Sequence, residues 1–399
     1  MRKPSDSNDD RGRLGPLYFR LSGFYFFYFA LLGGMAPFWS VFLESKGFSA
    51  LEIGQLMSIL MLTKLIAPNL WAYVGDRTGH RLLLMRWGCF LAFVIFAGFL
   101  MQTEFWWFVS VMALFSFFWN AVLPQFEVIT LNNLGHQRSR YSQIRLWGSI
   151  GFIASVQLLG AVFDYLSIEW LPYILGVLLL LIWLAGMQPF NDASGVTAHK
   201  KGALRGVLKE RSVIAFLGIS FLLQLGHGPY YTFYSLYLEQ HHYSRLIIGT
   251  LWAVGVWAEV ILFVFMPKLL ERFSMRSITL TALLLTAFRW IVIARLPDNL
   301  LILFLAQLLH AASFGAMHAV AMHFIHDRFY GRAEGQGQAL YASVSFGGGG
   351  FLGALAGGYF ADLYGMASSF LFSALVTIGA LILGMLHYRP DESCTRVKH

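Results

Sequence analysis

The chain has 399 residues, of which 57% are hydrophobic and only 13% are charged. Soluble domains carry about 25% charged residues, so this composition excludes an ordinary soluble domain and is typical of a protein that crosses a membrane many times. The net charge of +8 at pH 7 would suit a nucleic-acid partner, but its distribution along the chain argues against one.

Hydropathy divides the chain into twelve predicted transmembrane helices. A polar segment precedes the first helix without a signal-peptide cleavage pattern, so we expect that helix to be retained. The segments are too long and too uniformly apolar for barrel strands, which predicts an all-α membrane protein. The predicted helices are 17–43, 49–75, 82–101, 104–133, 141–163, 169–188, 212–238, 244–269, 276–296, 299–326, 335–361 and 367–388.

The longest polar stretch between spans separates the sixth and seventh helices. It covers residues 189–211 and predicts a linker between an N-terminal half, 17–188, and a C-terminal half, 212–388. Residues 1–16 and 389–399 form the predicted terminal tails.

Lysine and arginine predict the orientation of the chain. With the N-terminus inside the cell, the segments between spans place most of the 29 basic residues on the cytoplasmic side, a strong positive-inside bias. This bias explains the net charge without nucleic acid and predicts cytoplasmic N- and C-termini. The exceptions are Lys46, Arg245 and Arg295 outside, and Lys64, Arg145 and Arg289 within spans.

The two halves repeat at an offset of 195 residues. Residues 37–56 fall on 232–251 with nine of twenty positions identical, including Ser49 on Ser244 and Gly54 on Gly249. An offset of six spans is a parallel repeat with a pseudo-two-fold axis along the membrane normal. Transporters with this arrangement bind substrate between the two halves.

A resemblance to a known family follows from the motifs. The loop AYVGDRTGHR (72–81) resembles the signature of the major facilitator superfamily at Asp76, Arg77, Gly79 and Arg81, although Ala72 replaces the first glycine and His80 a basic residue. The superfamily implies a cytoplasmic gate at Asp76, Arg77 and Arg81. Other segments resemble the phenylpropionate permease branch, which is related to lactose-permease-like proton symporters: PFWSVFL (37–43), RLWGS (145–149), HGPYYTFYSLY (227–237), AEVILF (258–263), FRW (288–290) and LHAASFGAMHAVAM (309–322).

Five formal charges lie well inside predicted spans: Lys64, Glu127, Arg145, Glu259 and Arg289. At about 2.5–3.5 kcal/mol each, their insertion costs roughly 12–17 kcal/mol before any pairing. They are either structural ion pairs or parts of a substrate and proton site. Because buried ion pairs stabilise weakly compared with apolar replacements, we favour the functional interpretation.

The positions of these charges within helical hairpins suggest partners. Glu127 and Arg145 are each nine residues from the middle of one loop, and Glu259 and Arg289 are each fifteen residues from the middle of another. Equal spacing predicts equal depth, so each Glu is expected to face its Arg.

Lys64 has no acid within one helical turn, so its partner must come from another helix or from the substrate. The offset of 195 relates Lys64 to Glu259, which predicts a cation and an acid at one depth in opposite halves. We therefore expect Lys64 to attract the carboxylate of an anionic substrate while Glu259 carries a proton.

His310 lies near the middle of the tenth helix and can be a buried hydrogen-bond donor or a titrating group. With Glu259 and Arg289 it resembles the Glu–Arg–His proton-handling cluster of lactose-permease-like symporters. Those symporters carry an acid one turn after the histidine, but residues 311–313 are Ala, Ala and Ser here. This difference favours Glu259 as the proton carrier.

Other candidates are less specific. His318 joins the proton-coupling candidates, and Glu127, Arg145, His227 and Tyr231 join Lys64 as candidate substrate-binding residues. His227 and Tyr231 belong to an aromatic stretch of helix seven that also suits an interfacial belt. Neither cysteine belongs to a metal-binding pattern, and we expect no metal and no cofactor beyond the proton gradient.

The sequence therefore predicts a proton-coupled symporter that imports a small organic solute by alternating access. The resemblance implies an aromatic carboxylic acid such as 3-phenylpropionate. A sugar or nucleoside symporter and a drug or solute exporter working by proton antiport remain alternatives. HExxH, GxSxG and phosphate-loop motifs are missing, which argues against an enzyme. We expect a monomer in the bacterial inner membrane, with substrate, protons and lipid as its partners.

Overall fold

The structure is a computed structural model that describes residues 15–192, 204–329 and 334–390. The predicted tail 389–399, apart from its first two residues, and nearly all of the tail 1–16 lie outside the described residues. So does the middle of the predicted linker 189–211. The described part of the chain is helical and contains no strand.

The first half contains six long helices in chain order. Short 3₁₀ turns, η1 (Ala97–Leu100), η2 (Gly135–Arg140) and η3 (Ile168–Trp170), join some of them. The helices are α1 (Gly15–Ser45), α2 (Ala50–Thr78), α3 (Arg81–Phe96), α4 (Phe105–Leu134), α5 (Tyr141–Phe163) and α6 (Leu171–Gly186).

The second half repeats this arrangement after the short helix α7 (Leu204–Val207). Its tenth and eleventh spans each contain a π-helical segment, η4 (Ala311–Ala316) and η6 (Ser343–Gly349). The helices are α8 (Arg211–Gln240), α9 (Arg245–Arg272), α10 (Met275–Arg295), α11 (Leu300–Leu308), α12 (Met317–Arg328), α13 (Glu334–Ala342), α14 (Gly350–Tyr364) and α15 (Met366–His387).

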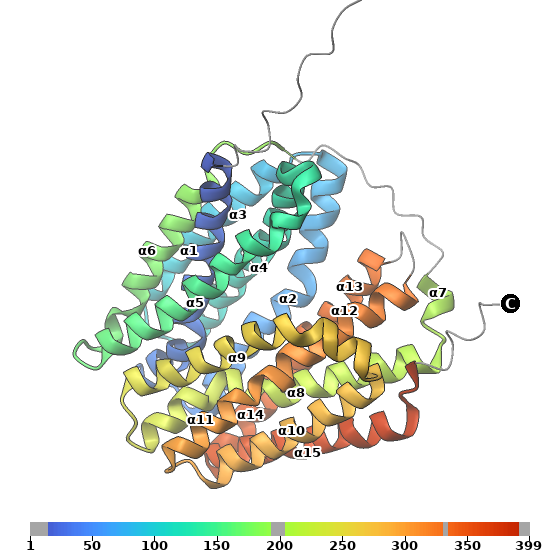
Figure 1. Ribbon diagram of the computed structural model, residues 1–399. Helices are drawn as coiled ribbons and strands as arrows, with labels where there is room; N and C mark the ends of the chain where they lie inside the picture. The colour runs from blue at the N-terminus through green and yellow to red at the C-terminus, as the bar shows by residue number, and fades with distance from the viewer. Residues whose placement is uncertain (1–14, 193–203, 330–333, 391–399) are drawn as a thin grey trace, which may run out of the picture.

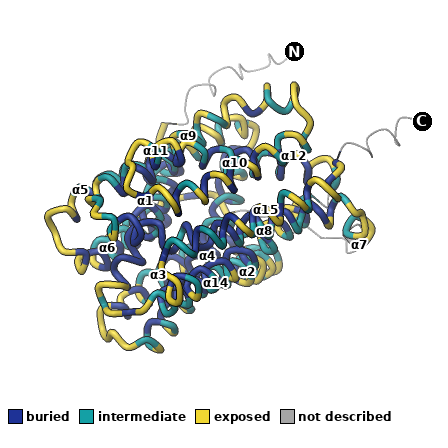
Figure 2. Tube along the Cα trace, turned by 90° about the horizontal axis from the view of Figure 1, so that it is seen from below, coloured by how far each residue is buried: buried dark blue, intermediate teal, exposed yellow. Residues whose placement is uncertain are grey.

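Eleven helical stretches within the described ranges are long and apolar enough to cross a membrane. One of them, Phe105–Phe163, contains both α4 and α5, which are joined by η2 with a non-helical Gln137. It therefore holds two spans, and the twelve-helix prediction is confirmed. Figure 2 shows buried residues along the inner faces of the helices. Large apolar side chains such as Val264 (71% exposed) and Leu375 (68%) face outward, as expected against lipid.

The sequence repeat corresponds to matched helix starts. Ser49 and Ser244, which the offset relates, are the N-caps of α2 and α9. The side chain of Ser49 accepts a hydrogen bond from the backbone of Glu52, and that of Ser244 accepts one from Ile247. Each cap satisfies a free N–H group and so fixes where its helix begins.

The two halves meet closely at one end, where α1 turns into α2 and α8 into α9; we call this the hairpin end. A Cβ atom on Gly54 of α2 would lie 2.7 Å from the Cα of Gly358 in α14. On Gly249 of α9 it would lie 2.2 Å from the carbonyl oxygen of Val156 in α5. These repeat-related glycines therefore let two pairs of helices from opposite halves pack backbone to backbone.

Two aspartates add polar contacts between the halves at the hairpin end. Asp164, directly after α5, accepts hydrogen bonds from the backbone N of Arg245 (2.6 Å) and Leu246 (3.4 Å) at the start of α9. Asp362 of α14 accepts one from the backbone N of Leu51 (3.3 Å) at the start of α2. A carboxylate is stabilised by the partial positive charge of a helix N-terminus. We call these contacts the two aspartate latches.

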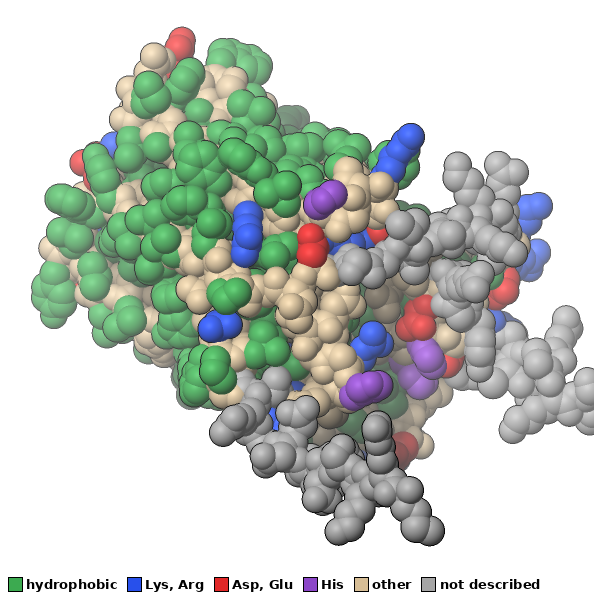
Figure 3. All heavy atoms as spheres, turned by 90° about the horizontal axis from the view of Figure 1, so that it is seen from above, with side chains coloured by type: hydrophobic (Ala, Val, Ile, Leu, Met, Phe, Trp, Pro, Cys, Tyr) green, Lys and Arg blue, Asp and Glu red, His purple; other side chains and the backbone are tan. Residues whose placement is uncertain are grey.

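The opposite end, where the linker joins the halves, is less closely packed. Among the described residues, hydrogen bonds between the halves lie at the hairpin end, apart from one between Asn69 and Ser343 (3.1 Å). In Figure 1 the halves diverge toward the linker end, at α2 on one side and α12 and α13 on the other. Figure 3 views this end from above and shows basic, acidic and histidine side chains gathered there, beside an otherwise largely apolar surface.

Candidate functional site

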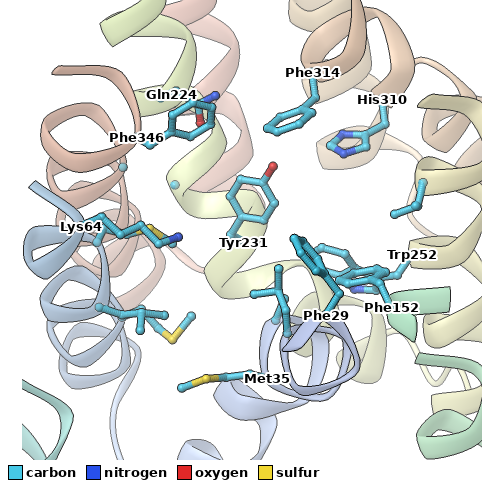
Figure 4. Close-up of a pocket in the computed structure, with 18 of the residues that line it drawn as sticks. Phe29, Met35, Lys64, Phe152, Gln224, Tyr231, Trp252, His310, Phe314 and Phe346 are labelled. Atoms are coloured by element: carbon cyan, nitrogen blue, oxygen red, sulfur yellow. The ribbon is translucent and has the colours of Figure 1, made fainter. Parts of the chain in front are cut away.

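A cavity of about 310 Å³ lies between the two halves. Helices α1, α2 and α5 line it from one side, and α8, α9, η4 and η6 line it from the other, mostly with apolar and aromatic side chains. Figure 4 shows the cavity walls. Four ionisable side chains that line it are Lys64, Arg145, Glu259 and His310.

Lys64 faces this cavity because its neighbour fixes α2 against α4. The hydroxyl of Thr63 donates to Ser116 (2.8 Å) and accepts from the amide of Asn120 (2.9 Å), both on α4. Lys64 points the other way, and in Figure 4 its ammonium enters the cavity. In the part of the chain that the structure describes, no hydrogen bond or ion pair joins it to the protein.

Glu259, His310 and Arg289 form a chain of hydrogen bonds. Oε1 of Glu259 lies 2.7 Å from Nε2 of His310, and Nδ1 of His310 lies 3.1 Å from Nη1 of Arg289. A guanidinium only donates, so Nδ1 accepts and the imidazole proton sits on Nε2, from which it is donated to the carboxylate. The geometry therefore defines a neutral histidine between an acid on the cavity wall and a buried arginine.

Arg289 is held rigidly behind the cavity. It is fully buried, and its guanidinium donates to Gln307 (3.0 Å) and Ser313 (3.3 Å). The same group lies over the rings of Tyr230 (4.4 Å) and Trp290 (4.5 Å). These four contacts hold the guanidinium in one position. His310 is the side chain that links it to Glu259.

Two glycines lie beside the contact between Glu259 and His310, and Gly255 is the tighter of the two. A Cβ atom on Gly255 would lie 3.1 Å from Cδ2 of His310, and one on Gly315 would lie 3.6 Å from Cγ of Glu259. Gly315 belongs to η4, the π-helix that begins directly after His310. Isolated π-helical turns are frequent at functional sites, and this one brings the histidine and the acid together.

Arg145 and Glu127 of the first half do not form the predicted ion pair. The guanidinium of Arg145 lies 3.9 Å from the ring centroid of Phe29 and lines the cavity. Glu127 is absent from the cavity wall and accepts a hydrogen bond from the hydroxyl of Tyr141 at 3.5 Å. Arg145 therefore lines the cavity, and the partly exposed Glu127 does not.

The other candidates on α8 and the tenth span are divided between the wall and the protein interior. Tyr231 lines the cavity. His227 is fully buried behind it, with Nδ1 2.8 Å from the carbonyl of Leu223. His318 also lies outside the cavity wall and stacks on Phe314 at 6.1 Å. Neither histidine can touch a ligand in the cavity without a rearrangement.

Residues 18–372 match the family described as MFS_1 like. The chain belongs to this family. A probable 3-phenylpropionic acid transporter of Escherichia coli (strain K12) is 29% identical over 329 residues, covering 81% of this chain and 86% of that protein. Maltose permease of Geobacillus stearothermophilus is 27% identical over 379 residues, covering 92% and 93%. The crystal structure of nucleoside transporter NupG has a TM-score of 0.80 at 18% identity, covering 92% of this chain and 98% of that one.

These matches make the chain a secondary transporter of the major facilitator type and not an enzyme. The family resemblance and the fold class predicted from the sequence are confirmed. The matched region contains all five charges that the sequence places within spans.

The transporter departs from the sequence prediction in how its charges pair. No direct ion pair joins Glu259 to Arg289 among the described residues, because His310 stands between them. The pair predicted for Glu127 and Arg145 is likewise replaced, because Arg145 lies over the ring of Phe29 and Glu127 accepts a hydrogen bond from the hydroxyl of Tyr141. Counting from a loop predicts the depth of a side chain but not the direction in which it points around its helix.

The motif between α2 and α3 lies at the linker end of the transporter. Asp76 and Arg81 form a close ion pair, and Arg81 also donates to Gln125 of α4 at 2.9 Å. Arg77 instead donates to the hydroxyl of Tyr73 at 3.0 Å. Two of the three predicted gate residues are thus in contact with one another.

Gln224 lines the cavity and was missed by the sequence analysis. It is 5% exposed, and its amide has no hydrogen-bond partner in the described ranges. Its polar amide within an apolar span is a signal that the sequence offers, although a weaker one than a formal charge. Trp252 and Phe29, which also line the cavity, could not be separated from the many aromatic residues of the chain.

Proposed function

We propose that this transporter is a proton-coupled symporter that imports a small aromatic carboxylic acid, with 3-phenylpropionate as the representative substrate. One observation carries the proposal: Lys64, an ammonium without a protein partner in the described part of the chain, shares a cavity with Glu259, an acid hydrogen-bonded to a buried histidine. The cavity thus offers a cation for a substrate carboxylate and a separate acid for a proton.

The proposed cycle follows from these two groups. The substrate carboxylate binds Lys64, and its ring packs on the apolar wall, which includes Phe29, Phe152 and Trp252. Glu259 takes up a proton, and this weakens its hold on His310, because a neutral acid accepts a weaker hydrogen bond than a carboxylate does. The Glu259–His310–Arg289 chain, and with it α9 and α10, then becomes free to rearrange.

We place the protein in the bacterial inner membrane as a monomer, with both termini in the cytoplasm. In this orientation the linker end faces the cytoplasm, so the described conformation is inward-facing. Residues 17–188 and 212–388 act as the two rocking units, and Asp76, Arg77 and Arg81 act as the cytoplasmic gate. The proton gradient supplies the energy, and no cofactor takes part.

A sugar or nucleoside symporter is the second candidate. It is favoured by the maltose permease among the relatives and by the polar groups of the cavity that carry no charge, such as Gln224 and Ser149. An exporter working by proton antiport could use the same acid. The direction of flux in oriented vesicles separates export from import.

The test uses purified protein and two ligands of similar shape, 3-phenylpropionate and its neutral amide. Lys64→Gln should raise the dissociation constant for the acid about tenfold or more while changing that for the amide far less, because a hydrogen bond to a charged group is lost. Lys268→Gln is the matched control, since Lys268 is exposed at the far end of α9. Equal weakening of both ligands would assign Lys64 to packing, and wild-type binding of a sugar or nucleoside but of no acid would refute the anion proposal.

A further inference from the structure

One face of α8 presents polar groups to the cavity that the proposed cycle does not use. Gln224, Gly228 and Tyr231 line the cavity, and their spacing of four and three residues places them in one row along the helix. Neither the amide of Gln224 nor the hydroxyl of Tyr231 has a hydrogen-bond partner among residues 15–192, 204–329 and 334–390. Between them Gly228 contributes no side chain, and a Cβ atom there would lie 2.4 Å from the backbone carbonyl carbon of Gly353, so this glycine lets α14 pack directly against α8 beside the row.

The hydroxyl of Tyr231 is held in place by its ring. The ring lies 5.4 Å from that of Tyr230 and stacks on Trp252 at 6.2 Å, while His227 lies 6.0 Å away on the protein side. Figure 4 shows the hydroxyl pointing into the cavity toward the side where Gln224 and Phe314 lie. Its neighbour Tyr230, by contrast, has a protein partner, Gln307, at 3.0 Å.

Gln224 is held in place by the π-helix η6. A Cβ atom on Gly349 would lie 3.1 Å from Cβ of Gln224 and 2.5 Å from the carbonyl oxygen of Phe221, so only a glycine lets η6 approach α8 so closely. Gln224 is 95% buried by this packing, since its exposed fraction is 5%. Its amide, which both donates and accepts, remains directed to the cavity that it lines.

Lys64 reaches the cavity from a different wall. It belongs to α2 of the first half, whereas Gln224 and Tyr231 belong to α8 of the second half. In Figure 4 the ammonium of Lys64 and the hydroxyl of Tyr231 do not meet in the cavity. A ligand whose carboxylate binds Lys64 therefore presents a different part of itself to the row on α8.

When the cavity is occluded, the amide of Gln224 and the hydroxyl of Tyr231 can determine which ligands bind. Alternating access requires a state in which the cavity is closed from both sides and has lost most of its water. A buried amide or hydroxyl left without a partner is costly, whereas a ligand that supplies the partner removes that cost. A site built to bond a polar group then discriminates against ligands that lack it.

We propose that Gln224 and Tyr231 form a second polar subsite, and that the substrate is an aromatic acid whose ring carries a hydrogen-bonding substituent such as a hydroxyl. This inference rests on the proposed function, since it takes the carboxylate to bind Lys64. It also departs from the Escherichia coli relative, a probable transporter of 3-phenylpropionic acid, because that acid has an unsubstituted ring. We therefore expect 3-phenylpropionate, with its unsubstituted ring, to bind more weakly than a ring-hydroxylated derivative.

The test measures binding of three sets of acids to purified full-length protein: 3-phenylpropionate, its 2-, 3- and 4-hydroxyphenyl derivatives, and the matching methylphenyl derivatives. A methyl group has nearly the size of a hydroxyl but forms no hydrogen bond. In the wild type, at least one hydroxyl derivative should bind about tenfold more tightly than its methyl counterpart. Tyr231→Phe should bring that ratio close to one, and Gln224→Leu should lower it.

Tyr234→Phe is the matched control, because Tyr234 lies on the same helix and is absent from the cavity wall. It should retain the wild-type ratio. The inference is overturned if the wild type binds the acids without favouring any hydroxyl derivative, or if Tyr231→Phe weakens all acids equally. If the wild type binds none of the acids, the proposed function itself fails and this inference fails with it.

Discussion

His310 connects the cavity to the buried charge of the second half. Its Nε2–H group donates a hydrogen bond to Glu259, and its Nδ1 accepts one from Arg289. The ring therefore carries one N–H proton, and each of its nitrogens has a hydrogen-bond partner. A second proton cannot enter the ring while Arg289 keeps its position. In the proposed cycle Glu259, which lines the cavity, is therefore the member of this hydrogen-bonded chain that takes up the proton.

Glu259→Gln should therefore separate coupling from transport. Glutamine keeps the size of the side chain and can still accept from His310, but it does not bind a proton. We expect the variant to lose uphill accumulation of the labelled acid and to keep exchange across the membrane. The measurement is uptake into proteoliposomes with and without a pH gradient, and wild-type accumulation would remove Glu259 from the mechanism.

At the same scale, the sequence predicted which residues carry charge in the membrane but not how they pair. Lys64 and Glu259 could be singled out because a charge stands out in an apolar span, and both line the cavity. Arg145 could not be seen to lie over Phe29, because aromatic residues occur throughout the chain. The bridge through His310 depends on η4, and a π-helical turn leaves no mark on the pattern of apolar residues.

At the scale of elements, the predicted spans agree with the structure to within three residues at every end when η1 is counted as the last turn of the third span. Hydropathy ends where a helix leaves the apolar layer, and capping residues such as Ser49 and Ser244 fix the start. The two π-helices could not be predicted in this way. They leave the span ends unchanged and alter only the directions of side chains along the helix.

Gly255 controls the distance between α9 and His310. Gly255→Ala places a methyl group 3.1 Å from Cδ2 of His310, closer than most carbon contacts, so the ring must move away from Glu259. We expect the variant to lose part of its uphill accumulation while it still exchanges substrate. Gly379→Ala is the control, since a Cβ atom there meets nothing within 4 Å. Equal accumulation by both variants would contradict a positioning role for Gly255.

The two aspartate latches hold opposite halves together through helix N-termini. Asp164→Asn combined with Asp362→Asn keeps the side-chain shape and removes both charges. A charge at a helix N-terminus contributes about 0.3–1 kcal/mol, so removing both charges should increase opening at the hairpin end roughly threefold to thirtyfold. Alkylation of a cysteine introduced at Ser149, which lines the cavity, measures this opening from the hairpin side.

Asp298→Asn serves as the control for the latches. Asp298 also lies at the hairpin end, but it contacts His241 at 2.6 Å within its own half. It should leave the alkylation rate unchanged. If the double latch variant behaves like this control, the packing of Gly54 and Gly249 alone keeps the halves closed.

At the scale of the whole molecule, the close contacts gather at one end, so access to the cavity should be one-sided. In a background with Cys394 replaced by serine, and with Cys89 buried, a cysteine at position 149 should react faster in inside-out than in right-side-out vesicles. A substrate that favours the outward state should reverse the order. Equal rates from both sides would contradict the inward-facing assignment.

The position of the Gly54–Gly358 contact turns α2 into a lever with its fulcrum near one end. At about 1.5 Å per residue, Lys64 lies about 15 Å from Gly54, and Thr78 at the end of the helix lies about 36 Å from it. Any rotation about this contact moves the linker end more than twice as far as it moves Lys64. The linker end can thus move far enough to close the passage while the ammonium of Lys64 moves little. The flexible four-carbon side chain of a lysine can keep its contact with a bound carboxylate during that small movement.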